Sequence, residues 1–428
     1  MIEATFALFN VDQLVTMAPG SHPAAQGPLG IIERAALAAK GECIVWVGTM
    51  QEMHEQVRLT ADATVLNTHG RTVLPGFVDP HTHPVFAGER SGDFYARALG
   101  ERYADQLNAG GIMRTVQATR AKSEDELLDL AYQRADVFLR HGVTTIGAKT
   151  GYGLTAEDEA KSLRVLNRLQ HLHPLKTVPT FLGAHVVPSD FDGSTDAYVT
   201  QLIDEWLPAA QGHAQFVDVW CEDGVFSTEQ CRRILTRARE MGFQLTAHAN
   251  EIGPGDGVRL AASLGAKSVD HAVFLEQQDI DALRDAGTVA VLLPGTTFSL
   301  GSDRYAPARR LLDAGVTVAL GTDFNPGTSY TQNMPFIVTL AVLKLGMTPE
   351  EAFRAATLGG AAALDLQDRV GSLEPDKYCD FVAYCTGDYR DIPYQYAMNL
   401  VDTVVARAQV TVQDGQTVTN PRALLRPA

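Results

Sequence analysis

Short apolar runs recur through the middle of the chain, from residue 70 to about 365, and segments with helical periodicity separate them. These runs lack the alternating polar positions of a sheet that has one face in water, so each predicts a strand buried on both faces. The eight runs span residues 73–78, 144–148, 177–183, 216–220, 243–247, 267–269, 289–293 and 317–320. Eight alternating strand and helix units predict an α/β fold, a (β/α)8 barrel of the TIM type.

Two of the intervening helices have recognisable starts. Ser227 and Gln230 have the spacing of a capping box, and Thr348 and Glu351 repeat that spacing with a proline at the first helical position. An open doubly wound sheet is the alternative architecture, and it predicts a glycine-rich phosphate-binding loop after the first strand. The sequence at that place is Asp-Pro-His-Thr-His, residues 79–83, so the barrel is the preferred prediction.

The two ends of the chain have a different pattern. Residues 1 to about 65 contain short strand-like pieces such as 43–48, and similar pieces return at 380–384 and 403–410. We therefore expect both ends to meet in one smaller β-rich domain. The predicted division gives 1–68 and 369–428 to the small domain and 69–368 to the barrel. A chain of 428 residues suits one barrel of ~250 residues with a companion domain.

Composition narrows the classes of partner. The formal net charge of −16 opposes binding to nucleic acid and to anionic lipid. No apolar stretch reaches the ~18 residues of a membrane span, and the N-terminus lacks the pattern of a signal peptide, so we expect a cytoplasmic protein. The five scattered cysteines form no Cys-x-x-Cys pair and predict reduced thiols. An anionic small substrate would need an arginine or lysine inside its pocket.

Polar side chains follow several of the predicted strands. His81 and His83 follow the first run, His185 the third, His248 and Glu251 the fifth, Asp270 and His271 the sixth, and Asp323 and Asn325 the eighth. The C-terminal ends of barrel strands lie on one rim, where TIM-barrel enzymes carry their working residues. A single histidine after a strand is more often a hydrogen-bonded structural residue. The repetition at equivalent strand ends is what predicts a common site.

A metal ion is the chemistry that these residue types favour. His81 and His83 are two positions apart and can face the same side of a strand, while His248 and Asp323 complete a set of three neutral ligands and one anion. Such a set suits one divalent ion, which lowers the pKa of bound water from ~15.7 toward ~7 and favours hydrolysis. A binuclear site of this kind needs a bridging group after the fourth strand. No lysine stands there, and Glu222 keeps the bridging alternative open.

Several motifs carry a specific resemblance. The segment Pro-Gly-Phe-Val-Asp-Pro-His-Thr-His, residues 75–83, resembles the signature of the amidohydrolase superfamily. Longer segments resemble its imidazolonepropionase branch, and these are 83–90, 150–154, 182–185, 292–297 and 321–327. The resemblance extends over nearly the whole chain. It implies hydrolysis of 4-imidazolone-5-propanoate to N-formimidoyl-L-glutamate in histidine degradation, with zinc or iron as the metal and a homodimer as the assembly.

The resemblance also implies roles for individual residues. The metal ligands of the family fall on His81, His83, His248 and Asp323. Its substrate contacts fall on Arg90, Tyr103, Tyr152, His185, Glu251, Asn325, Gly327 and Thr328. The catalytic residues would be Glu251, which lies three positions after a ligand and can carry a proton, together with His271 and Asp323. The guanidinium of Arg90 suits the propanoate carboxylate, because it offers a rigid fork of donors.

Simpler interpretations accompany these roles. Arg90 would otherwise form a surface salt bridge, Tyr152 would pack on the barrel rim, and Glu251 would only orient His248. Lys149 is expected to be buried against an acidic residue as a structural ion pair, without a catalytic role. Two other functions compete with the main hypothesis. One is a purine or pyrimidine deaminase of the same superfamily, which needs no carboxylate-binding arginine, and the other is a noncatalytic barrel that serves as an interaction module.

Overall fold

The barrel that the sequence predicts is present. The computed structural model describes residues 1–101, 106 and 111–418. Its eight parallel strands follow one another around the barrel in chain order, and they are β5 (Phe77–Thr82), β6 (Val143–Lys149), β7 (Lys176–Ala184), β8 (Phe216–Cys221), β9 (Gln244–Ala249), β10 (Ser268–His271), β11 (Val289–Leu292) and β12 (Val318–Leu320). A parallel bridge between Thr82 and Phe324 brings the first and last strands together. The backbone N–H of His83 also donates to the carbonyl of Phe324, 2.8 Å away.

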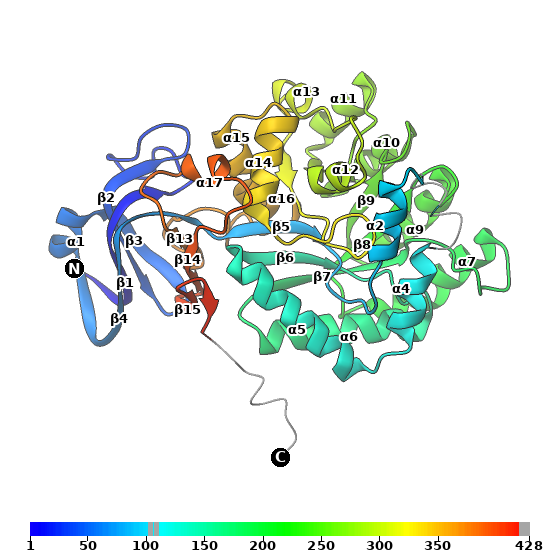
Figure 1. The fold of residues 1–428 in the computed structure, drawn as a ribbon, viewed down its shortest axis with the longest axis horizontal. Helices are drawn as coiled ribbons and strands as arrows, with labels where there is room; N and C mark the ends of the chain where they lie inside the picture. The colour runs from blue at the N-terminus through cyan, green and yellow to red at the C-terminus, as the bar shows by residue number, and fades with distance from the viewer. Residues whose placement is uncertain (102–105, 107–110, 419–428) are drawn as a thin grey trace, which may run out of the picture.

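Helices surround this barrel, as Figure 1 shows. The helices from α2 to α16 are α2 (Ser91–Ala98), α4 (Gly111–Arg120), α5 (Glu124–Arg140), α6 (Ala156–Leu172), α7 (Thr195–Gln201), α8 (Leu207–Ala210), α9 (Thr228–Glu240), α10 (Gly257–Ser263), α11 (Gln277–Ala286), α12 (Pro294–Ser299), α13 (Ala308–Asp313), α14 (Met334–Lys344), α15 (Pro349–Arg354) and α16 (Gly360–Ala363), with the π-helical turns η1 (Leu202–Trp206) and η2 (Ala355–Gly359). Both predicted capping boxes are present, at Ser227 and Thr348. Because helices cover the outside, strands such as β6, β8 and β11 are buried along their whole length.

The first apolar run is divided between two sheets. Residues Thr72 to Pro75 pair with a strand near the C-terminus, and the chain joins the barrel only at Phe77. Gly76 allows this transition, because a Cβ atom there would lie 2.2 Å from Oγ1 of Thr144. The prediction of one barrel strand over 73–78 is therefore wrong, since an apolar pattern alone does not reveal that a strand changes partners.

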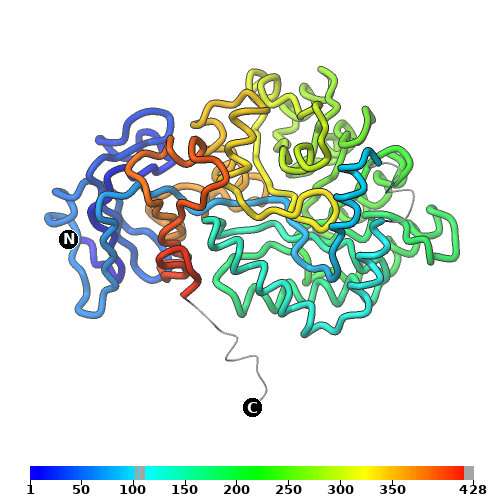
Figure 2. The backbone as a smooth tube through the Cα atoms, in the orientation of Figure 1, coloured from blue at the N-terminus to red at the C-terminus, as the bar shows by residue number. Residues whose placement is uncertain are grey.

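The two ends of the chain build the second sheet, as expected. Its strands, in spatial order, are β16 (Gln416–Thr417), β15 (Gln409–Gln413), β14 (Val401–Ala406), β13 (Phe381–Tyr384), β4 (Val57–Pro75), β1 (Ile2–Val15), β2 (Ile31–Lys40) and β3 (Cys43–Thr49). The sheet is mixed, because β1 and β4 are parallel whereas the other neighbours are antiparallel. Helices α1 (Met50–Gln56) and α17 (Asp391–Tyr394) belong to the same parts of the chain. Figure 2 shows the N-terminal strands and the C-terminal hairpin on the same side of the barrel.

One expected strand is a hairpin. Residues 403–410 read as a single run, but β14 ends at Ala406 and β15 begins at Gln409. Arg407 and Ala408 form the turn between them, with φ values of 50° and 61°. Hairpin turns with two positive φ values usually contain glycine or asparagine, so the sequence does not announce this one. The prediction of one strand here is wrong.

Two further predictions concern chemistry and location. All five cysteines are free, as the absence of a paired motif suggested. None of the helices in the described part of the chain combines the length and the apolar character needed to span a bilayer.

Candidate active site

The two histidines of the first barrel strand lie at its C-terminal end. His81 is in β5 and His83 follows that strand directly, and the centroids of their rings are 5.3 Å apart. Both side chains are buried. The prediction that the pair faces one side of the strand is confirmed by the contact of both rings with the same carboxylate. The Oδ1 atom of Asp323 lies 3.4 Å from Nε2 of His81 and 3.7 Å from Nε2 of His83.

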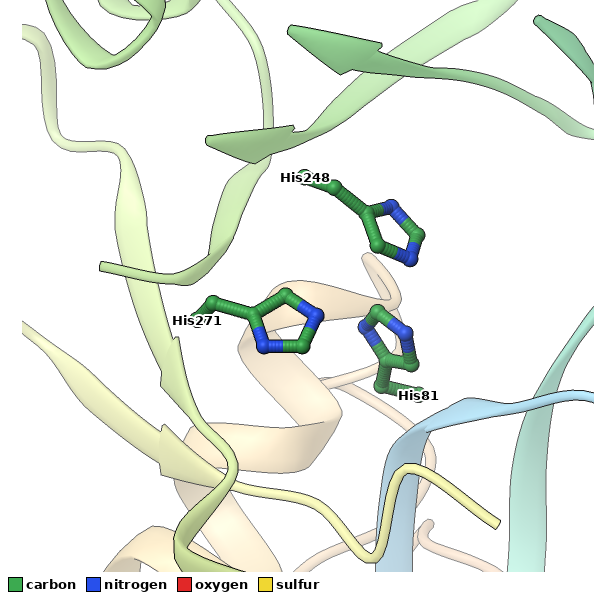
Figure 3. Close-up of side chains that lie close together, drawn as sticks. All are labelled: His81, His248 and His271. Atoms are coloured by element: carbon green, nitrogen blue, oxygen red, sulfur yellow. The ribbon is translucent and has the colours of Figure 1, made fainter. Parts of the chain in front are cut away.

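Side chains from three other strand ends converge on the same point. His248 comes from β9, His271 ends β10, and Asp323 follows β12. The ring of His81 is 4.4 Å from that of His248 and 5.5 Å from that of His271, between centroids. Figure 3 shows these three rings pointing toward one another. Histidines that are far apart in the sequence thus meet at one mouth of the barrel.

This cluster fits a divalent metal ion. In two groups of three, His81 with His248 and His271, and His81 with His83 and Asp323, the candidate ligand atoms all lie within 4.8 Å of one another. The Nε2 atom of His81 belongs to this cluster, is buried, and makes no hydrogen bond within the described residues. Its other ring nitrogen, Nδ1, lies 2.7 Å from Oδ2 of Asp270. A buried imidazole nitrogen without a partner, among carboxylate and imidazole donors, is what a metal ion would satisfy. The structure also places His271 among the candidate ligands, beside the predicted four.

The cluster forms the floor of a pocket. Its lining includes His83, Arg90, Ile112, Tyr152, His185, Trp220, His248, Glu251, His271, Asp323, Asn325, Gly327 and Thr328. All the substrate-contact residues that the sequence suggested are among them except Tyr103, which lies outside the described residues. Ile112 and Trp220 were missed. Trp220 stands two positions after Asp218 on β8, so strand alternation directs both residues to the inside of the barrel.

Arg90 presents a guanidinium to this pocket. Its Nε donates to Oδ2 of Asp93 at 2.7 Å, whereas its Nη2 is buried and makes no hydrogen bond within the described residues. Arg90 is 6% exposed, so it is not the surface residue of the simpler interpretation. Gly327 lies against it, and a Cβ atom on that glycine would come within 2.5 Å of Nη1 of Arg90. A buried guanidinium with a free donor is suited to an anionic ligand.

Tyr152 and His185 form one wall of the pocket. The Nδ1 atom of His185 lies 2.8 Å from the carbonyl oxygen of Gly151, to which it can donate, and its ring centroid is 5.4 Å from that of Tyr152. Burial lowers the pKa of His185 to about 4, and the nearby ring of His248 acts in the same direction. His185 is therefore neutral at physiological pH. With Nδ1–H bound to the backbone, its Nε2 atom is left as an acceptor on the pocket side.

Glu251 and His271 lie next to each other beside the cluster. Oε2 of Glu251 is 3.6 Å from Nε2 of His271. Burial raises the pKa of Glu251 well above its usual range, and the carboxylates of Asp323 and Glu222 raise it further. A carboxyl group with a raised pKa can hold and release a proton near neutral pH.

The carboxylate of Glu222 holds the loop after β9. Its Oε2 accepts a hydrogen bond from the backbone N–H of Glu251 and its Oε1 from that of Gly253, both at 2.9 Å. Both carboxylate oxygens are thus used to hold the loop after β9. The bridging alternative for Glu222 is not supported by this arrangement.

The loop after β12 is held from within. Oδ1 of Asn325 accepts hydrogen bonds from the backbone N–H groups of Gly327 and Thr328, both at 2.8 Å. Asp323 is fixed by Thr296, whose Oγ1 donates to Oδ2 at 2.5 Å. Thr296 was not identified as a site residue from the sequence, although it lies in one of the family-like segments.

Comparison with known proteins agrees with this geometry. Residues 72–418 match the amidohydrolase family, and the chain belongs to that family. A zinc-bound adenosine deaminase from Xanthomonas campestris has a TM-score of 0.75 to this chain at 18% identity, covering 99% of this chain and 97% of that one. Atrazine chlorohydrolase from Arthrobacter aurescens, complexed with zinc and atraton, has a TM-score of 0.72 at 19% identity, covering 98% of each chain. At these identities the likeness concerns the fold.

Curated relatives define the branch. Imidazolonepropionase from Symbiobacterium thermophilum is 44% identical over 409 residues, which are 94% of this chain and 96% of the relative. Imidazolonepropionase from Geobacillus kaustophilus is 45% identical over 414 residues, or 94% and 97% of the two chains. The chain belongs to the imidazolonepropionase family, and the resemblance drawn from its motifs is confirmed.

Proposed function

We propose that this protein hydrolyses 4-imidazolone-5-propanoate to N-formimidoyl-L-glutamate in histidine degradation, using one divalent metal ion held by His81, His83, His248 and Asp323. The observation that carries the proposal is a pair of buried groups without hydrogen-bond partners, one in the histidine cluster and one on the pocket beside it. Nε2 of His81 has no hydrogen-bond partner among the described residues, and neither has Nη2 of Arg90. The first suits a cation and the second suits an anion, so the pocket offers complementary ends to a substrate that combines a reacting ring with a carboxylate.

Arg90 orients the substrate in this proposal. Its free Nη2 binds the propanoate carboxylate. The guanidinium thereby supplies a local positive charge for an anionic substrate in a chain whose formal net charge is −16. The imidazolone ring then lies toward the histidines, against the wall that Tyr152 and the Nε2 acceptor of His185 form. Asn325, Gly327 and Thr328 also line the pocket, and Tyr103 is proposed as a further substrate contact.

The hydrolytic step follows from this orientation. A divalent ion at the cluster supplies Lewis acidity and lowers the pKa of bound water toward ~7. Glu251 accepts a proton from the attacking water as the oxygen of that water bonds to the ring carbonyl carbon. Glu251 then returns the proton to the ring nitrogen as the C–N bond breaks. His271, which burial keeps neutral by lowering its pKa to about 3, orients the water or the developing oxyanion. Asp323 takes part both as a ligand and as a catalytic carboxylate.

Zinc and iron are both proposed as the metal, since imidazole and carboxylate ligands serve either ion. Related solved structures support zinc, because the adenosine deaminase from Xanthomonas campestris and the atrazine chlorohydrolase from Arthrobacter aurescens were both solved with zinc bound. A nucleobase deaminase is the second candidate function, since the adenosine deaminase from Xanthomonas campestris shares the fold. The buried Arg90 favours the imidazolone substrate over a neutral base, which carries no carboxylate.

The test is a spectroscopic assay with freshly generated imidazolonepropionate, with purified protein before chelation, after chelation and after addition of zinc or iron. We expect the ring absorbance to fall with the metal-loaded protein, to be stable after chelation and to fall again on reloading. A parallel measurement of ammonia release from a panel of nucleobases tests the second function. Ammonia release without loss of the imidazolone would overturn the proposal.

A further inference from the structure

A buried lysine lies inside the barrel directly below the histidine cluster. Lys149 ends β6 and is 2% exposed. Its Nζ atom is 2.6 Å from Oδ2 of Asp218 and 2.9 Å from Oδ2 of Asp270. These residues come from β6, β8 and β10, which are alternate strands of the barrel, and alternate strands supply the side chains of one interior layer. The buried ion pair expected for Lys149 is therefore confirmed, but it has two carboxylate partners.

Each of these carboxylates also touches a histidine of the cluster. Oδ2 of Asp270 lies 2.7 Å from Nδ1 of His81, at hydrogen-bond distance. Oδ2 of Asp218 lies 3.0 Å from Nδ1 of His248, which makes no hydrogen bond within the described residues, so this contact is an electrostatic one. The oxygen that contacts the lysine is in both cases the oxygen that contacts the imidazole. The other oxygen of Asp270 accepts a hydrogen bond from Oγ of Ser268 at 2.7 Å, which holds this carboxylate in place. Lys149 thus joins the two carboxylates that contact His81 and His248, whose imidazoles approach the site from different strands.

The contacts have a chemical consequence for the imidazoles. An ionised carboxylate only accepts hydrogen bonds, so it favours the tautomer in which Nδ1 carries the proton. The Nε2 lone pair of each ring is then free and directed at the mouth of the barrel. Two carboxylates this close together inside a protein repel each other and are costly to bury without a counter-charge. The ammonium group of Lys149 supplies that charge at the same carboxylate oxygens that contact the imidazoles.

We propose that Lys149 is a positioning residue of the metal site: by holding Asp218 and Asp270 together, it fixes His81 and His248 with Nδ1–H inward and Nε2 toward the metal. The inference rests on the proposed metal site and goes beyond its ligands. The ammonium also occupies a place that would otherwise attract a cation, because ligand atoms of Asp218, His248 and Asp270 lie within 4.8 Å of one another. The divalent ion is thereby directed to the Nε2 side of the cluster.

The experiment measures zinc affinity rather than turnover. Metal-free wild-type protein and a Lys149→Met variant are titrated with zinc in competition with a chromophoric chelator, and their folding is compared by circular dichroism and thermal unfolding. Without the ammonium the two carboxylates move apart and the imidazoles lose their orientation. We expect zinc binding to weaken by about 10- to 100-fold, the range for loss of a group that orients metal ligands. Lys267→Met is the matched control. Lys267 pairs with Asp365 at 2.8 Å and directly precedes the N-terminal end of β10, whereas the histidine cluster lies at the C-terminal end of that strand. The zinc affinity of Lys267→Met should stay within about twofold of wild type.

A double-mutant cycle separates positioning from a general loss of packing. Asp218→Asn and the combination of Lys149→Met with Asp218→Asn are titrated in the same way. If Lys149 acts through the carboxylates, its removal costs at least about threefold less affinity when Asp218 is already neutral, because interacting residues give non-additive effects. The double variant removes one charge of each sign and so leaves the net buried charge unchanged. It therefore provides a second measurement if Lys149→Met does not fold, and its zinc affinity should then lie within about tenfold of that of Asp218→Asn.

The outcomes are distinct. Zinc binding by Lys149→Met that equals wild type would overturn the inference while leaving the proposed function intact. An equal loss in both backgrounds would also overturn it, since Lys149 would then act independently of Asp218. A wild-type protein that binds no zinc or iron would overturn the proposed metal site and this inference together.

Discussion

Replacing Glu159 with glutamine should damage the substrate pocket without touching any substrate contact. Glu159 lies in the first turns of α6 and is 1% exposed. Its carboxylate accepts hydrogen bonds from the backbone N–H groups of Gly151 at 3.1 Å and of Gly153 and Leu154 at 2.8 Å. This loop carries Tyr152, and the carbonyl of Gly151 faces Nδ1 of His185. One buried carboxylate therefore shapes the pocket wall.

The magnitude follows from the three bonds. The amide oxygen of glutamine can replace Oε1 and keep the bonds to Gly153 and Leu154, but the amide NH₂ group would face the N–H of Gly151, donor against donor. A hydrogen bond to a charged group contributes ~1.5–3 kcal/mol, and a neutral one about 1 kcal/mol. One charged bond is lost and two become neutral, which amounts to roughly 2.5–7 kcal/mol. Relief from burying a charge, which raises the pKa of Glu159, offsets part of this loss and leaves about 2–4 kcal/mol.

Part of that energy will appear as lower stability and part as a displaced loop. A misplacement of ~1 Å near reacting groups can cost about 100-fold, so we expect kcat/KM for imidazolonepropionate to fall about 10- to 100-fold. Steady-state kinetics and zinc titration should be measured together. Zinc affinity should change less than kcat/KM, because His81, His248 and Asp323 keep their own supports and only His83 contacts this loop, through the carbonyl of Thr150. Glu157→Gln, an exposed neighbour on the same helix, is the matched control. If Glu159→Gln retained kcat/KM within twofold of Glu157→Gln, Glu159 would not organise this wall.

Three further substitutions test separate parts of the protein. Arg90→Met should raise the KM for imidazolonepropionate by about 30-fold or more, because losing one partner of a buried charged pair costs 2–5 kcal/mol; steady-state kinetics that give an unchanged KM would refute the anchoring role. Glu251→Gln should lower kcat by about 10²- to 10⁴-fold while metal analysis finds the ion still bound, and near-normal turnover would exclude Glu251 as the proton carrier. Asp380→Asn should stabilise the protein by about 3 kcal/mol at pH 7.5 and by about 1 kcal/mol at pH 4.5, as measured by denaturant unfolding. Burial raises the pKa of Asp380 from 3.8 to about 6, so the folded state binds this proton more tightly than the unfolded chain does and stability falls as pH rises between those values; an equal effect at both pH values would contradict this assignment.

The fold could be predicted from the sequence where a strand is buried on both faces. Strands β6 to β12 begin and end within one or two residues of the apolar runs that predicted them. The failures have a common cause. At Gly76 the apolar pattern continues while the chain passes from one sheet to another, and at Arg407 and Ala408 it continues through a tight turn. Apolar periodicity reports burial, but it does not report which strand a segment pairs with or where a two-residue turn divides a run.

The site was predictable to the extent that its residues stand at strand ends. His81, His83, His248 and Asp323 are separated widely in sequence, and they meet because parallel strands end on one rim. The supporting residues follow a different rule. Asp218 lies within an apolar run, and Glu159 lies on a helix after the loop that it holds. A charged residue at an inward position of a buried strand is the signal that could have identified Asp218, since such a charge needs a partner inside the barrel.

These supports divide the site into two parts with different origins. His81 and His248 are held by carboxylates from the barrel interior, and Asp323 is held by a hydroxyl group of α12, at the end of the neighbouring strand. Tyr152, His185 and the turn at Gly327 are held by the loops above the rim. Changes inside the barrel should therefore act first on metal affinity, whereas changes in the loops should act first on substrate binding and turnover. Lys149→Met and Glu159→Gln are the two extremes of this division, and a loss of zinc affinity in both variants, or in neither, would mean that the interior and the loops do not act separately.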